Sequence, residues 1–74
     1  LPNGVLEAMA TGLPVVLSDI EQHLEVYEAN TKIGKTFMLN NLDDCVAKMQ
    51  ELVSSDYKLA GKEAYNSAHE NISA

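Results

Sequence analysis

Several residue types that mark particular classes of protein are scarce in this 74-residue chain. Tryptophan and arginine are absent, and Cys45 is the single cysteine. One cysteine excludes an internal disulfide framework and is typical of a reducing compartment, so we expect a cytoplasmic protein. We interpret Cys45 as a small core side chain, because no histidine has a motif relation to it.

Positive charge is also in short supply. Five lysines stand against eleven acidic side chains, which gives a formal net charge of −6. Nucleic acids and anionic membranes attract clustered positive charge, so this balance argues against both as general partners. No apolar run approaches the length of a membrane span, and nothing resembles a secretory signal. The chain also lacks a D-x-D motif and a His/Cys cluster with ligand spacing, so we expect no metal cofactor.

The most informative stretch is the first nineteen residues. Asn3 is a good N-cap, and the residues from Val5 to Ala10 are mostly apolar, which predicts a helix buried on more than one side. Gly12 suits the left-handed position after a helix, and Pro14 prevents the helix from continuing. Residues 15–17 are wholly apolar and indicate a short buried strand of a parallel sheet.

Glu7 interrupts the apolar pattern of this helix. In one interpretation it is an ordinary acidic residue near the positive end of a helix dipole. In the other, the helix N-terminus and Gly4 form an anion site, and Glu7 accepts hydrogen bonds from sugar hydroxyls beside a bound phosphate. Composition alone favours the first interpretation.

The order of the residues favours the second interpretation. Residues 1–19 follow the pattern L-P-x-x-x-x-E-A-M-A-x-G-x-P-V-V-x-S-D. This pattern resembles the donor-site signature of the group 1 glycosyltransferases, which are retaining, use nucleotide-sugars and have the GT-B fold. In that family two glutamates separated by seven residues bracket the donor. The resemblance implies that Glu7 is the second glutamate and binds the ribose hydroxyls.

The same resemblance assigns the residues ahead of Glu7. It implies that the backbone of Leu1, Pro2, Asn3 and Gly4 faces the diphosphate and the transferred sugar. The first glutamate of the pair would precede Leu1, so we expect residues 1–74 to be a single partial domain. This domain would be the C-terminal part of the nucleotide-sugar-binding Rossmann-like domain, inactive without an N-terminal acceptor domain.

The activity implied by the resemblance is transfer of a sugar from a nucleoside-diphosphate donor to a hydroxyl acceptor with retention. The acceptor would be a saccharide, a lipid-linked glycan or a protein, and no metal or other cofactor is implied. The full-length enzyme would work in the cytoplasm, or at the inner face of the membrane. Two alternatives remain: a binding or assembly module without chemistry, and a nucleotide-sugar epimerase of the same fold.

The middle of the chain predicts a helix over 21–28 and a second strand over 33–39. Glu25 matches the acidic residue of the family's H-x-E segment after the strand, so it is a secondary donor-site candidate. Histidine is a residue type that can transfer protons, but His23 has no visible partner in the sequence, and we expect it at the surface. Residues 34–36 have the letters that end a Walker A motif, but the required earlier glycine is Ala29, so we reject that interpretation.

The last third predicts two helices. Asn41 suits an N-cap with Asp44 as its capping-box partner, and Asp56 suits the cap of a final helix over 57–70. We expect that last helix on the surface, because its apolar face is thin. The helix after Asn41 carries an apolar stripe that predicts core packing, formed by Leu42, Cys45, Val46, Met49, Leu52 and Val53.

Together these elements predict an α/β fold, a partial Rossmann-like domain of order α-β-α-β-α-α with two parallel strands. It would be the second half of a GT-B C-terminal domain. Two strands alone are marginal in water, so we also expect a homo-oligomer through the open sheet edge, or low stability.

Overall fold

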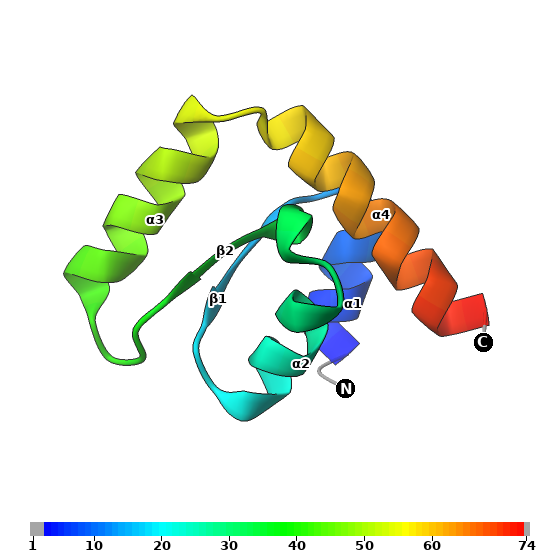
Figure 1. The fold of residues 1–74 in the computed structure, drawn as a ribbon, viewed down its shortest axis with the longest axis horizontal. Coiled ribbons are helices and arrows are strands. Elements are labelled where there is room, and N and C mark those ends of the chain that lie inside the picture. Colours follow the sequence, from blue (N-terminus) through cyan, green and yellow to red (C-terminus); the bar gives the residue numbers. More distant parts are fainter. Residues whose placement is uncertain (1–2, 74) are drawn as a thin grey trace.

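The structure, a computed structural model, describes residues 3–73, and within this range it is a small α/β protein (Figure 1). The predicted order of helices and strands is confirmed, with a short 3-10 helix, η1, that the sequence did not predict. The elements are α1 (Asn3–Ala10), β1 (Val15–Ser18), α2 (Glu21–Ala29), η1 (Thr31–Ile33), β2 (Gly34–Phe37), α3 (Leu42–Ser54) and α4 (Tyr57–Ser73).

The two strands are parallel, as predicted, with Val15 paired to Gly34 and Ser18 paired to Phe37. Gly34 allows this pairing because a Cβ at that position would overlap the backbone of Val15. β2 is shorter than the predicted range 33–39. Met38 and Leu39 leave the ladder, since the N–H of Met38 donates to Asp44 at 2.7 Å instead.

The chain reverses sharply between α1 and β1. Gly12 has a φ of 86°, the left-handed conformation that favours glycine. The N–H groups of Gly12 and Leu13 donate to the carbonyls of Met9 and Ala8, so the last turn of α1 is closed by main-chain hydrogen bonds. The predicted end of this helix is therefore confirmed.

The core lies between α1, the sheet, α2 and α4. Met9 and Ile33 are its largest fully buried side chains, and Val15, Leu17, Val26, Ala64 and Ala68 complete it. Met9 is the one buried residue of α1, while Val5, Leu6 and Ala10 are only partly covered. α1 contacts both α4 and β1, while the side with Asn3, Gly4 and Glu7 is exposed, so the predicted burial on more than one side is confirmed in part.

α4 lies on the surface as predicted, with Tyr57, Leu59 and Tyr65 exposed, but one face of it is buried more closely than its thin apolar pattern indicated. Ala64 and Ala68 have no exposed area, and α4 packs beside α1 (Figure 1). A Cβ at Gly61 would overlap the carbonyl oxygen of Gly12, so the two backbones approach very closely there. The apolar face of α4 consists of small side chains, and these let its backbone approach α1 closely. A narrow apolar face can therefore still be buried.

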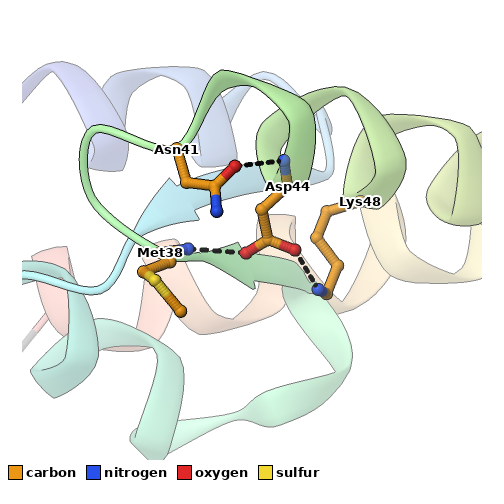
Figure 2. Close-up of polar contacts among 4 residues, drawn as sticks. All are labelled: Met38, Asn41, Asp44 and Lys48. Atoms are coloured by element: carbon orange, nitrogen blue, oxygen red, sulfur yellow. Dashed lines mark hydrogen bonds and ion pairs between the residues drawn. The ribbon is translucent and has the colours of Figure 1, made fainter.

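The N-terminus of α3 is held by a small polar network (Figure 2). The Asn41 side chain accepts from the N–H of Asp44 at 2.9 Å, which confirms the predicted cap. Asp44 does not complete a capping box. One of its carboxylate oxygens accepts from the N–H of Met38, and the other pairs with Lys48 at 2.8 Å. Both hydrogen bonds hold the pKa of Asp44 below its ordinary value, and the one from Lys48 has the larger effect.

The apolar stripe of α3 does not form core, contrary to the prediction. Leu52 is buried, and Cys45 is half-buried with a free thiol. The other four side chains face outward, because no described element covers that side of α3. Leu42, Val46, Met49 and Val53 are exposed by 76, 44, 51 and 71%.

Candidate functional site

The candidate site lies where α1 begins and β1 ends. Because the chain reverses at Gly12, the first residues of α1 and the carboxyl end of β1 lie at the same end of the molecule (Figure 1). In open α/β sheets this is the edge at which ligands bind. The backbone therefore brings the described start of α1 and the residues that close β1 to one edge of the fold.

The residues of α1 that the motif singles out are open to solvent. Asn3, Gly4 and Glu7 are all exposed, and a Cβ built on Gly4 would meet nothing within 4 Å. Asn3 and Glu7 are four residues apart and so lie on one face of the helix. Leu1 and Pro2, the other two predicted donor-site residues, lie outside the described residues.

One detail of this region differs from the prediction. α1 already includes Asn3, so this residue lies in the first turn and not at the cap position. Glu7 is the fifth described residue of α1, near the N-terminal end of the helix, where the helix dipole favours a negative charge.

Glu25 lies on α2, a different element, and its side chain is exposed. Val26 of the same helix joins the core cluster that contains Met9, so α2 packs on the core shared with α1. Among residues 3–73, no hydrogen bond or ion pair joins Glu25 to α1. Asn3, Gly4 and Glu7 thus come from α1, whereas Glu25 comes from α2.

His23 has a partner that the sequence did not reveal. Its Nδ1 lies 3.0 Å from the Ser18 hydroxyl and 3.1 Å from the Ser18 carbonyl oxygen. Depending on the tautomer of the ring, Nδ1 donates to the Ser18 carbonyl oxygen or accepts from the Ser18 hydroxyl. One sequence feature could have predicted this contact: a polar residue at the end of a strand is followed five positions later by a histidine in the first turn of a helix.

Asp19 joins the two strand ends. Its Oδ1 accepts from the N–H of Leu39 at 2.9 Å, and its own N–H donates to the Phe37 carbonyl at 2.9 Å. The segment after β2 is thereby held beside the end of β1. The last residue of the 1–19 motif thus has a structural role at this edge.

The edge offers hydrogen-bonding groups, and Asn3, Gly4 and Glu7 there are exposed. Two surface hollows lie beside β2, and Lys35 and Ser55 line both of them, whereas Glu7 lines neither. The described residues contain no group of three His, Cys, Asp or Glu side chains placed to hold a metal ion. Between residues 3 and 73, no helix combines the length and apolar character needed to cross a membrane.

Comparisons with known proteins do not assign this chain to a family. Neither the family models, nor the curated proteins, nor the solved structures contain a match to this chain. The class that the structure defines is a small α/β protein with two parallel strands within residues 3–73. A function for it has to be argued from the 1–19 motif and its position in the fold.

Proposed function

We propose that this chain forms part of the donor site of a retaining, nucleotide-sugar-dependent glycosyltransferase. In this proposal residues 1–74 are a partial Rossmann-like domain, the second half of the C-terminal domain of a GT-B enzyme. The observation that supports it best is the agreement between motif and fold. The 1–19 motif resembles the group 1 signature at nearly every position, and the start of α1 and the end of β1 lie at the same end of the molecule.

The N-terminus of α1 supplies the electrostatic part of the proposed mechanism. Free backbone N–H groups and the helix dipole favour an anion at such a terminus. Gly4 adds no side chain that would keep a diphosphate away from the backbone, and the space beside it is open. As the glycosidic bond to the diphosphate breaks, negative charge grows on the leaving group, and fixed N–H dipoles stabilise it.

In the proposed mechanism, Glu7 positions the nucleotide-sugar donor. Its carboxylate is an acceptor for two ribose hydroxyls, and one helical turn separates it from the amides at the start of α1. A nucleoside diphosphate would place its phosphates at the terminus and its ribose beside Glu7. The role of Glu7 is thus to orient the donor, and the chemistry of transfer requires the acceptor domain as well.

The proposal is tested by titrating the 15N-labelled chain with UDP, GDP and ADP and following the backbone amide resonances. The matched control for each nucleotide is its nucleoside, which lacks the diphosphate. We expect the amides of Gly4 and Val5 to shift with the diphosphates and not with the nucleosides. An absence of shifts with all three diphosphates at millimolar concentration, or shifts confined to α3 and α4, would contradict the proposal.

A further inference from the structure

The carboxyl end of β1 holds a histidine that has no role in the proposed donor site. Ser18 is the last residue of β1, and His23 lies in the first turn of α2. The Nδ1 atom of His23 lies 3.0 Å from the Ser18 hydroxyl oxygen and 3.1 Å from the Ser18 carbonyl oxygen. Both residues are half-buried, so the imidazole ring is held against the edge at which β1 ends.

These contacts leave the second ring nitrogen, Nε2, for another partner. Within residues 3–73, both contacts of the His23 ring are made by Nδ1. Both oxygen atoms of Ser18 can accept a hydrogen bond, so the arrangement accommodates the protonated ring, in which both nitrogens donate. In that form Nδ1 donates to Ser18, and Nε2 can donate to an anion. Ser18 thus orients a cationic donor.

His23 is the one side chain of α1, β1 and α2 that can carry a positive charge. The chain has no arginine, and its first lysine is Lys32, which follows α2 and lies just before β2, at the amino end of the parallel sheet. Lys48 is paired with Asp44. A bound diphosphate carries more than one negative charge, and the amides of a helix N-terminus offer it only partial positive charge. His23 can add a full positive charge at this edge.

The packing of α2 places His23 on the same side of the sheet as α1. Val26 lies one turn after His23 and is buried in the core cluster, and Val5, in the first turns of α1, packs against the same cluster. Figure 1 shows α1 and α2 together on one side of the sheet, with α3 on the other. The first turns of α1 and α2 thus border the end of the molecule at which β1 ends.

We propose that His23 binds the diphosphate of the nucleotide by donating from Nε2, and that Ser18 is a positioning residue that orients the ring. This inference rests on the proposed function and adds a residue from a second helix to that site. Transfer of the sugar leaves further negative charge on the diphosphate, and a charge-assisted donor stabilises that charge more than a neutral one. The acidic residues nearest to His23 in the sequence, Asp19 and Glu21, are exposed, so solvent and salt screen their repulsion of the ligand.

The ring nitrogens of His23 give a direct test in the parent chain. Long-range 1H–15N spectra of the 15N-labelled chain show both of its histidines, and His69→Gln assigns the signals of His69. The ligands are UDP, GDP and ADP, each compared with its nucleoside, at a constant pH of about 7.5, where a free histidine is mostly neutral. With the diphosphate that shifts the Gly4 amide, we expect the His23 nitrogens to move to the positions of a protonated ring. The nucleoside should leave them unchanged.

Two variants separate binding from positioning. His23→Ala removes a charge-assisted hydrogen bond and should weaken diphosphate binding about tenfold. Ser18→Ala should weaken it less, because the Ser18 carbonyl remains, and adding this change to His23→Ala should have no further effect. Lys58→Ala, the matched control, removes a positive charge from an exposed position of α4 and should leave the dissociation constant unchanged. Circular dichroism checks that each variant keeps its helices.

The results distinguish this inference from the function on which it rests. If the Gly4 amide shifts while the His23 ring does not, and His23→Ala binds as the parent chain does, the role of His23 is overturned and the donor site stands. If no diphosphate shifts the Gly4 amide, both are overturned. A His23 ring that responds equally to the nucleosides overturns its contact with the phosphates. Additive effects of Ser18→Ala and His23→Ala overturn the positioning role of Ser18.

Discussion

The carboxylate of Asp19 accepts a hydrogen bond from the backbone N–H of Leu39 at 2.9 Å. The two residues are twenty positions apart, and the bond links the end of β1 to the segment that follows β2. The two-stranded sheet has few other hydrogen bonds at this edge, because the pairing of its strands ends with Ser18 and Phe37. The contact therefore fixes the edge at which we place the donor.

Asp19→Ala should destabilise the fold by about 1 kcal/mol, the usual cost of losing an exposed hydrogen bond to a charged group. Asp19→Asn retains an acceptor oxygen and should lose less. Urea unfolding of the three proteins measures the difference, and amide exchange at Leu39 should accelerate in the alanine variant. An alanine variant as stable as the parent chain would contradict this account of the edge.

Gly61→Ala should destabilise the chain, although alanine is the better helix former by about 1 kcal/mol. The new Cβ would overlap the carbonyl oxygen of Gly12, and separating α4 from α1 to make room costs about 1–3 kcal/mol. Lys62→Ala, at the exposed neighbouring position, is the control and should be close to neutral. Thermal unfolding gives the sign, and a stabilised Gly61→Ala variant would show that the two backbones are not in contact.

Asn41→Ala should cost about 1 kcal/mol, because it leaves the N–H of Asp44 without its side-chain acceptor. Asn66→Ala, on an exposed position of α4, removes the same amide group where no cap depends on it. Chemical denaturation of both variants compares the two positions. Equal effects at Asn41 and Asn66 would argue that the cap contributes nothing to the fold.

The Asp44 network should make stability depend on pH on the acid side. Lys48 and the N–H of Met38 lower the pKa of Asp44 from an ordinary value of 3.8. The folded chain therefore binds protons less readily than the unfolded chain at this group. The resulting stabilisation is complete above pH 3.8 and is lost as the pH falls through the lowered pKa.

The comparison that isolates this effect is the parent chain against Asp44→Asn. The difference in their free energies of unfolding should be largest at neutral pH and should shrink as the pH falls below about 3.8, the ordinary pKa of the group. Urea titrations at neutral and acid pH measure it. A difference that does not vary with pH would mean that the carboxylate of Asp44 has no charged partner in the folded chain.

The sequence predicted local structure well, because local signals determine it. The turn at Gly12 follows from glycine and proline chemistry, and the cap at Asn41 follows from a side chain that reaches an amide three residues away. The strands were recognisable as short apolar runs between helices. The η1 turn was not predicted, because its Asn30 cap resembles the end of α2.

Burial was harder to predict, because it depends on which elements meet. The periodicity of α3 indicated a core helix, and yet Leu42 and Val53 are exposed because nothing described covers that face. The surface position of α4 was predicted, but the close approach of Gly61 on this helix to the backbone of Gly12 was not. For the site, the sequence predicted Asn3 as an N-cap and Gly4 before the helix, whereas the structure includes both in α1 with Glu7. The His23–Ser18 contact depends on a bend between strand and helix that the motif does not specify.

The central claim is that Glu7 orients a bound nucleoside diphosphate. Its most direct test is the dissociation constant of the nucleotide that shifts the Gly4 amide, measured for the parent chain, Glu7→Gln and the exposed control Glu51→Gln. We expect Glu7→Gln to weaken binding about tenfold, the effect of losing a charge-assisted hydrogen bond, and Glu51→Gln to leave it unchanged. Equal affinities for the parent chain and Glu7→Gln would contradict the claim.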